Sequence, residues 1–252
     1  MNNKIINYLN FFLIKTGFQI DQIETPLPVE TQLEDKKLIQ KIKPNSMSSN
    51  IRLIELINSI NYLIRNNIEG DFVECGVWKG ANLVLMQKLI ERNKLNSTRV
   101  YGFDTFDGMS EPTEFDFDLL GNSAKDLMSN TIKKEGRGIW AYSSLQTVEN
   151  NIQNSVNFPD NINLIKGKVE TTLLDDSNLP DRISLLRLDT DFYESTKIEL
   201  EVLFPKLEKG GVLIIDDYGH FKGARKAVDE YFGDRKIWLK YVDYTCRLYV
   251  KE

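Results

Sequence analysis

The sequence predicts an α/β fold in which helices cover both faces of a mostly parallel sheet. Apolar runs typical of buried strands alternate with segments of helical spacing between about residues 71 and 232, and this alternation indicates successive βα units. Two of these runs, at 183–189 and 212–216, each lead into closely spaced aspartates. Two final strand-like runs, at 236–242 and 246–251, predict a hairpin that adds an antiparallel strand at the sheet edge.

The amino-terminal part is expected to precede this α/β unit as a helical extension. Residues 5–14 have the pattern of an amphipathic helix that is too short to span a bilayer. Residues 19–45 contain three prolines and predict an extended connection wrapping the surface. We therefore expect residues 1–46 to form a helix and a connection that contact a second subunit or the core. Residues 47–252 are expected to form one domain.

Within this domain the boundaries follow from polar, glycine and proline punctuation. Residues 48–66 predict a helix, because leucines and isoleucines recur at helical spacing after a serine cap. Further helices are expected at 81–92, 144–154, 194–207 and 223–232. Strands are expected at 71–75, 99–104, 162–166, 183–189 and 212–216. Segment 105–141 is longer than an ordinary loop, and its Phe115, Phe117 and Trp140 favour a lid over the substrate.

Composition excludes several kinds of partner. The chain has 252 residues and a net charge of −5, and this acidic balance argues against a nucleic-acid partner. Two distant cysteines support neither a disulfide framework nor a zinc site, so a reducing, cytoplasmic location is expected. A single histidine, His220, excludes sites built on several imidazoles. No stable membrane insertion is expected.

Three aspartates are predicted to meet at one edge of the sheet. Ligands of open α/β sheets gather at the carboxyl ends of the strands, where Asp189, Asp216 and Asp217 would converge if their strands are neighbours. Carboxylates held together repel one another, and an all-oxygen set suits a hard cation such as Mg²⁺. The alternative is that these residues cap the helices that follow each strand.

The first predicted strand enters a glycine turn that suits a nucleoside cofactor. Residues 74–80 read Glu-Cys-Gly-Val-Trp-Lys-Gly, and glycines let a ligand approach the backbone closely. The next strand ends at Asp104, where an acid can accept both ribose hydroxyls. The middle glycine of the dinucleotide fingerprint is missing, which favours a cofactor without pyrophosphate. S-adenosylmethionine meets this description and NAD does not.

Together these motifs resemble the macrocin O-methyltransferase family of S-adenosylmethionine-dependent sugar methyltransferases. The resemblance spans roughly residues 70–231 and is carried by residues 74–80, 104–108, 186–196, 210–218 and 223–229. It implies a class I methyltransferase fold with a Rossmann-like sheet, bound S-adenosylmethionine and a divalent metal, usually Mg²⁺. Thr190 departs from the glycine expected there in many relatives.

The resemblance also implies roles for individual residues. Asp189, Asp216 and Asp217 would be the metal ligands. The turn residues Glu74, Gly76, Val77 and Gly80 would bind the cofactor, with Glu74 and Gly76 at its methionine end. Asp104 would hold the ribose, and Gly167, Val169 and Glu170 would border the adenine.

The implied reaction needs an activated hydroxyl and a base. A sugar hydroxyl is a poor nucleophile, since its pKa lies near that of water, about 16, and a bound metal lowers such a pKa by roughly eight units. Asp189 would act through the metal. Asp191 and His220, which follow the two metal-site strands, are the candidate bases. The alternatives are that Asp191 caps the following helix and that His220 is a surface loop residue.

Composition is the sequence feature that bears on which class of sugar accepts the methyl group. A richness in Asn, Ile and Lys favours a nucleotide-linked or surface-polysaccharide sugar, for example a GDP-heptose, over a macrolide deoxysugar. A catechol-type O-methyltransferase and a non-catalytic cofactor-binding module are the competing hypotheses. The apolar residues of segment 1–18 favour a homodimer or higher homo-oligomer.

Overall fold

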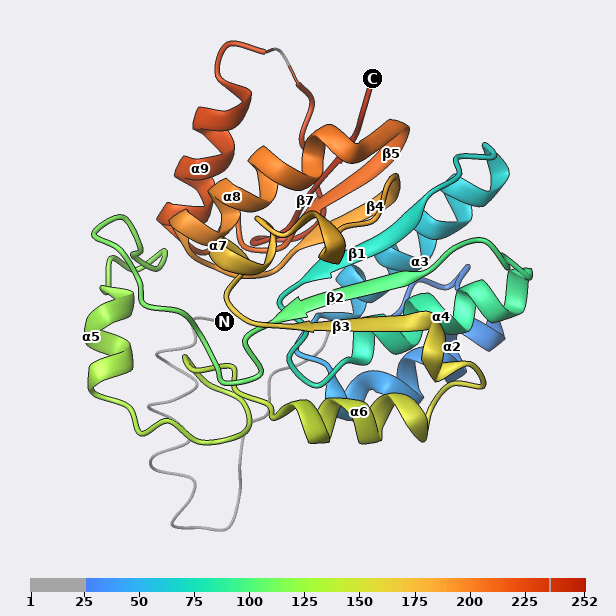
Figure 1. Cartoon of the computed structure of the whole chain (residues 1–252), viewed down its shortest axis with the longest axis horizontal. Helices are drawn as coiled ribbons and strands as arrows, with labels where there is room; N and C mark the ends of the chain where they lie inside the picture. The colour runs from blue at the N-terminus through green and yellow to red at the C-terminus, as the bar shows by residue number, and fades with distance from the viewer. Residues whose placement is uncertain (1–25, 236) are drawn as a thin grey trace.

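The computed structural model describes residues 26–235 and 237–252. Within these residues the strands form a seven-stranded sheet of order β3-β2-β1-β4-β5-β7-β6 (Figure 1). The parallel strands are β1 (Asp71–Cys75), β2 (Val100–Asp104), β3 (Ile162–Lys166), β4 (Ile183–Leu188) and β5 (Leu207–Ile215). The antiparallel strands are β6 (Lys240–Tyr241) and β7 (Arg247–Val250), with β7 paired to β5. The predicted mostly parallel sheet with an antiparallel hairpin is confirmed.

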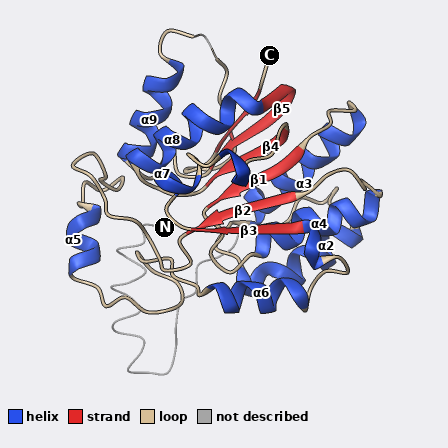
Figure 2. Cartoon of the chain, viewed as in Figure 1, coloured by secondary structure: helices blue, strands red, loops and turns tan. Residues whose placement is uncertain are grey.

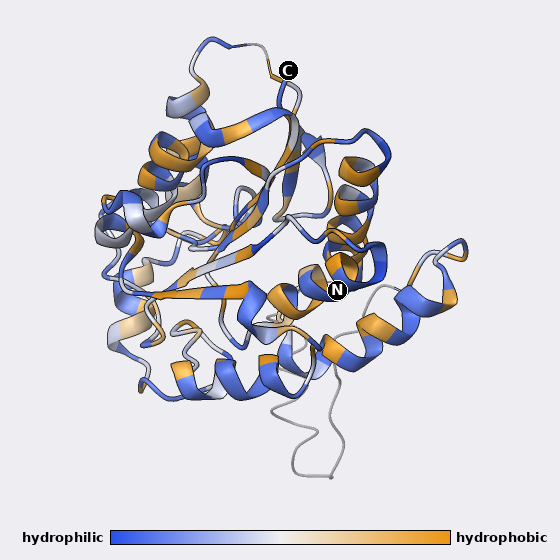
Figure 3. Ribbon diagram, turned by 45° about the vertical axis from the view of Figure 1, so that its right-hand side comes forward, coloured by the Kyte–Doolittle hydropathy of each residue, from blue (hydrophilic) through white to orange (hydrophobic). Residues whose placement is uncertain are grey.

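Helices cover both faces of the sheet (Figure 2). One face carries α2 (Leu33–Ile42), α3 (Asn50–Arg65), α4 (Ala81–Asn93) and α6 (Leu145–Gln153). The other face carries α7 (Val169–Thr172), α8 (Tyr193–Leu203) and α9 (Lys222–Phe232). Hydrophobic and hydrophilic residues alternate along these helices, as expected when one side of a helix faces a core (Figure 3).

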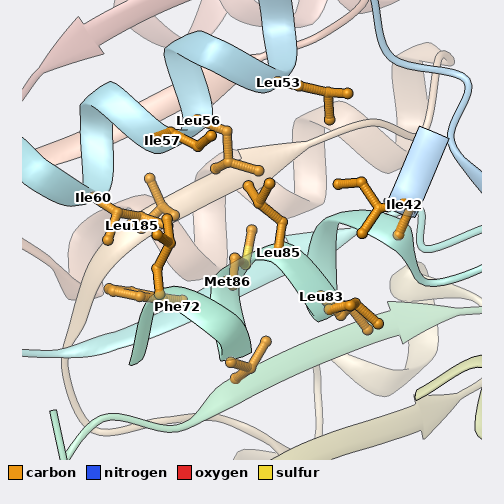
Figure 4. Close-up of a cluster of buried hydrophobic side chains, with 14 of the residues drawn as sticks. Ile42, Leu53, Leu56, Ile57, Ile60, Phe72, Leu83, Leu85, Met86 and Leu185 are labelled. Atoms are coloured by element: carbon orange, nitrogen blue, oxygen red, sulfur yellow. The ribbon is translucent and has the colours of Figure 1, made fainter. Parts of the chain in front are cut away.

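The two sides of each strand supply two separate cores. Phe72 of β1 and Leu185 of β4 point toward α3 and α4, whose leucines, isoleucines and Met86 pack over them (Figure 4). Their strand neighbours Val73 and Leu186 point to the opposite face, against α8 and α9. Each fully buried side chain of this kind contributes about 1.5–3 kcal/mol, so both faces hold the sheet rigid beneath its carboxyl edge.

One predicted element is wrong. The extended connection predicted over residues 19–45 contains a ten-residue helix, α2, whose Leu38, Ile39 and Ile42 are buried against the core. The prolines lie only at its flanks, at Pro26, Pro28 and Pro44, and so bound the helix without interrupting it. The predicted helix at residues 5–14 lies outside the described residues.

Other boundaries shift by a few residues. The helix predicted at 194–207 ends at Leu203, because Pro205 follows in a 3₁₀ turn and β5 already begins at Leu207. The hairpin strands are shorter than predicted, while β1 and β3 match their predicted ranges.

Segment 105–141 forms a long connection between β2 and α6 that contains the short helix α5 (Ala124–Ser129). Ala124 and Met128 pack against Phe192 and Phe221, at the starts of α8 and α9. The buried carboxylate of Asp116 accepts hydrogen bonds from the backbone N–H groups of Thr113 and Tyr193, so it joins this segment to α8.

Among the described residues no helix is long and apolar enough to cross a membrane. Cys75 and Cys246 are both buried and form no disulfide, as predicted.

Candidate active site

The carboxyl ends of β1, β4 and β5 lie side by side and are tied together by backbone hydrogen bonds. The Asp189 N–H donates to the Cys75 carbonyl at 2.9 Å, and the Asp216 N–H donates to the Leu188 carbonyl at 2.9 Å. Each strand therefore fixes the first aspartate of its neighbour. The prediction that β4 and β5 are neighbours is confirmed. The acidic residues that follow them lie at one edge of the sheet, here called the rim, and are Asp189, Asp191, Asp216 and Asp217.

Three carboxylates converge at this rim. Oxygens of Asp189, Asp191 and Asp217 lie within 4.8 Å of one another. The buried Oδ2 of Asp217 has no hydrogen-bond partner among the described residues. Asp191 has a φ of 67°, a left-handed conformation that costs a non-glycine residue energy and is held here by its surroundings.

The electrostatics of this cluster favour a bound cation. Burial raises the pKa of Asp189 and Asp217 well above the usual range, and neighbouring carboxylates raise it further. The same burial raises the pKa of Asp191 to about 7. A cation among the oxygens would relieve both effects, and an all-carboxylate set suits Mg²⁺. The residues therefore fit the predicted divalent metal.

Asp216 differs from its three acidic neighbours, because two arginines hold it. Its Oδ1 accepts a hydrogen bond from Arg187 at 2.8 Å, and its Oδ2 accepts one from Arg52. Burial alone would raise the pKa of Asp216, but Arg187 and Arg52 lower it below its usual value. The sequence predicts Asp216 as the third metal ligand, whereas the structure gathers Asp191 with the other two.

Arg187 lies beneath the rim and binds three carboxylates, a role that the sequence did not predict. Its guanidinium donates to Glu74 at 2.5 Å, to Asp189 at 2.6 Å and to Asp216 at 2.8 Å, with 3% of the side chain exposed. An arginine inside an otherwise apolar buried strand was the available signal, since a buried charge needs partners. Arg52, on α3, carried no comparable signal.

A first cavity opens beside the glycine turn. Its lining includes Gly76, Trp78, Phe103, Asp104, Thr105, Gly108, Met109, Gly167, Val169, Asp189, Thr190 and Asp191. Positive φ angles at Gly76 and Gly167 bring bare backbone to the wall, as a cradle for a ligand requires. The predicted cofactor residues Gly76, Asp104, Gly167 and Val169 thus border one space, which fits a nucleoside cofactor.

Asp104 also ties the turn together. Its carboxylate accepts hydrogen bonds from the N–H groups of Val77 at 2.7 Å, Trp78 at 3.1 Å and Phe106 at 2.7 Å. Burial raises the pKa of Asp104, although these bonds favour the charged form. The residue predicted to hold a ribose therefore has a second task, which is to fix the loop between β1 and α4.

A second, polar cavity of about 140 Å³ adjoins the first. It is lined by Asn45, Ser46, Met47, Ser48, Arg52, Val77, Trp78, Ala81, Asn82, Asp189, Asp191, Asp216 and Asp217. Met47, Trp78, Asp189 and Asp191 line both cavities, so the two spaces meet at the acidic rim. A methyl donor in one and an acceptor in the other would meet there.

Several predicted residues do not line either space. Glu74 is fully buried, and its Oε1 accepts from Arg187 and Asn82. Gly80 is the N-cap of α4, with a φ of 81°. Glu170 has a buried Oε2 without a described hydrogen-bond partner, and the Nδ1 of His220 also lacks one.

The aromatic residues of the predicted lid do not line either cavity. Phe115 packs on Tyr193, and the Trp140 indole N–H donates to the Thr131 carbonyl. Phe117 is half-buried, borders neither cavity and faces the Lys222 ammonium.

Comparisons with known proteins identify relatives of this chain. The family model described as Macrocin-O-methyltransferase (TylF) matches residues 31–251. The 8-demethyl-8-(2,3-dimethoxy-alpha-L-rhamnosyl)-tetracenomycin-C 4'-O-methyltransferase of Streptomyces olivaceus is 31% identical over 183 residues, covering 72% of this chain and 65% of that protein. The demethyldecarbamoylnovobiocin O-methyltransferase of Streptomyces niveus is 30% identical over 181 residues, covering 71% and 64%. The chain thus matches just under two thirds of the length of these relatives.

Solved structures show the same fold. The O-methyltransferase NovP superposes with a TM-score of 0.71 at 25% identity, covering 99% of this chain and 98% of that one. The calicheamicin methyltransferase CalS11 superposes with a TM-score of 0.57 at 18% identity, covering 92% and 99%. With the match over residues 31–251, these findings establish that the chain belongs to the macrocin O-methyltransferase (TylF) family.

Proposed function

We propose that this protein transfers a methyl group from S-adenosylmethionine to a sugar hydroxyl with the help of a divalent cation, Mg²⁺. The observation that carries the proposal is the junction of two cavities at Asp189 and Asp191, beside the unpartnered oxygen of Asp217. The cofactor would lie along the glycine turn and Gly167. The acceptor would enter the polar cavity.

The chain's own residues have distinct tasks in this scheme. Asp189 and Asp217, common to the predicted and observed acidic sets, would hold the cation. When bound, such a cation acidifies a coordinated hydroxyl and orients it. Arg187 keeps Asp189 fixed from below. Transfer forms one carbon–oxygen bond, breaks one carbon–sulfur bond and releases one proton.

Asp191 is the proposed acceptor of that proton. It lines both cavities, so its carboxylate lies where the donor and the acceptor would meet, as a general base must. His220 stays the second candidate. Burial lowers its pKa, so it is neutral and able to accept, but it borders neither cavity within the described part of the chain.

The acceptor class is also a proposal. The name of the tetracenomycin methyltransferase specifies a rhamnosyl group, which supports a sugar hydroxyl and favours a deoxysugar. The composition of this chain favours a nucleotide-linked or surface-polysaccharide sugar such as a GDP-heptose. Both are sugars, and a catechol is the contrasting acceptor.

A methyl-transfer assay tests the proposal. The wild-type protein is offered nucleotide sugars, glycosylated small molecules and catechols, with chelator or with added Mg²⁺. We expect turnover of a sugar that chelator abolishes and Mg²⁺ restores. Asp217→Asn should lose turnover while retaining S-adenosylhomocysteine affinity in calorimetry, because the ion acts on the acceptor. Full turnover in chelator would overturn the metal step, and exclusive use of catechols would overturn the sugar.

The cytoplasmic location and homo-oligomeric state stay predictions. The apolar segment expected to make the subunit contact lies outside the described residues. Light scattering of the full chain and of a version lacking residues 1–18 tests the oligomer. We expect a multimer that the deletion reduces in mass.

A further inference from the structure

The two arginines that hold Asp216 are held in different ways. Arg187 has 3% of its side chain exposed and binds three carboxylates, so it cannot leave one without disturbing the others. Arg52 has 17% of its side chain exposed and lines the polar cavity. Its Nη1 reaches Asp216, while its Nε lies 3.2 Å from Asp243.

Asp243 provides Arg52 with an independent anchor. Its Oδ1 accepts from the N–H groups of Thr245 and Cys246 and so fixes the turn between β6 and β7. Its Oδ2 accepts from the Ser49 hydroxyl at 3.0 Å, and Ser49 is the N-cap of α3. The guanidinium can therefore release Asp216 and keep Asp243 without moving α3 or the hairpin.

We propose that Arg52 is a displaceable counter-ion, which neutralises Asp216 in the metal-free protein and yields it when a divalent cation binds at the rim. This inference rests on the metal site of the proposed function. A cation beside Asp189 and Asp217 would repel the neighbouring guanidinium and attract the freed Asp216 oxygen. Asp216 would then join Asp189 and Asp217, as in the predicted ligand set.

The proposal gives opposite effects for the two partners of one ion pair. Arg52→Gln removes the competitor for Asp216, so Mn²⁺ or Mg²⁺ should bind about fivefold more tightly, as for loss of a partly exposed ion pair. Asp243→Asn removes the anchor but keeps an oxygen to accept from the hairpin turn. Arg52 then stays on Asp216, and the metal should bind about fivefold more weakly.

Calorimetric metal titration at one pH measures both effects, with thermal unfolding as the check on folding. The matched control is Lys240→Gln. This variant removes another ion pair between the hairpin and α3, in which Lys240 Nζ lies 2.7 Å from Glu55 Oε2, and neither residue lines the polar cavity. We expect the control to bind metal like the wild type. Asp243→Asn tests the proposal even if Arg52→Gln does not fold.

The outcomes separate this inference from the proposed function. Unchanged or weaker metal binding by Arg52→Gln, with normal wild-type binding, shows that Arg52 is only a structural link and overturns the inference alone. Shifts of the two variants in the same direction also overturn it. Absence of metal binding in both the wild type and Arg52→Gln overturns the metal step of the proposed function as well.

Discussion

Gly76 lies so close to Asp189 that a Cβ atom built on Gly76 would be 1.9 Å from the Asp189 carbonyl oxygen. This contact joins the ends of β1 and β4, where the cofactor turn and the acidic rim meet. Gly76 also has a φ of 86°, which side chains rarely adopt. Its missing side chain is therefore what allows the two halves of the site to touch.

Gly76→Ala should consequently damage the protein far more than an ordinary glycine substitution. Gly121 provides the control, because its φ is 85° and a Cβ there would meet nothing within 4 Å. Gly121→Ala should cost about 1–2 kcal/mol of unfolding free energy, the penalty of the left-handed conformation alone. Gly76→Ala should cost several kcal/mol more or prevent folding. Equal losses in urea unfolding would show that the close approach is unimportant.

Much of the sheet could be predicted from sequence, because a parallel strand buried on both faces is a continuous apolar run. β1 and β3 match their predicted ranges, and the hairpin strand lies at the edge. Helix α2 was not predicted, since the apolar part of its buried face is only Leu38, Ile39 and Ile42 in a charged segment between prolines. Such a face is specified by the α4 surface it covers, which one sequence does not reveal.

The aspartates of the site could be predicted from the sequence, whereas the arginines that bind them could not. Strand order places Asp189 and Asp216 together, so their meeting follows from topology. Arg52 reaches Asp216 from α3, 164 positions away in sequence, and no spacing rule connects them. Under the proposal above, Arg52 decides whether Asp216 can bind a cation, and motif spacing does not reveal that contact.

The lid proposed over residues 105–141 depends on Asp116. Its carboxylate is buried and binds the start of α8 through the Tyr193 N–H at 2.8 Å. Asp116→Ala should detach the segment, which supplies Thr105, Gly108 and Met109 to the first cavity. We expect faster proteolytic cleavage within the segment and weaker S-adenosylhomocysteine binding.

Asp126→Ala is the control for this prediction. Asp126 lies in the same segment on α5 but is exposed to solvent. Its loss should leave both the cleavage rate and the affinity near wild-type values. A lid that is cleaved equally slowly in all three proteins would contradict the role given to Asp116.

Glu199 predicts how stability depends on pH. It is fully buried on α8, accepts a hydrogen bond from Thr190, and has one oxygen without a described partner. Burial raises the pKa of Glu199 well above its usual value. A raised pKa in the folded state gives stability that is complete below the unfolded pKa, about 4.3, and is lost as pH rises through the folded pKa.

Glu199→Gln should therefore be tolerated, because glutamine mimics the protonated acid. The wild type should lose stability as pH rises above the usual pKa of a glutamate, and the variant should lose less over the same range. Urea unfolding at several pH values measures the difference. A variant with the wild-type pH slope would show that Glu199 is ionised in the folded protein.

Asp104 fixes the turn and is also predicted to bind the ribose, and a single substitution would not separate these two roles. Its carboxylate already binds the N–H groups of Val77, Trp78 and Phe106, so any change weakens the turn. Asp104→Asn leaves one accepting oxygen and should cost about 1–3 kcal/mol of stability. Weaker cofactor binding by this variant would follow from a disturbed turn as readily as from a lost ribose contact.

A cycle that changes both protein and ligand separates the two tasks. S-adenosylhomocysteine and an analogue lacking one ribose hydroxyl are titrated into wild type and Asp104→Asn. If Asp104 binds the ribose, removing the hydroxyl should weaken wild-type binding more than variant binding, with a coupling of about 1 kcal/mol or more. If the coupling is zero for both the 2′- and the 3′-deoxy analogue, Asp104 serves only the turn. In that case another residue lining the first cavity must bind the ribose hydroxyls.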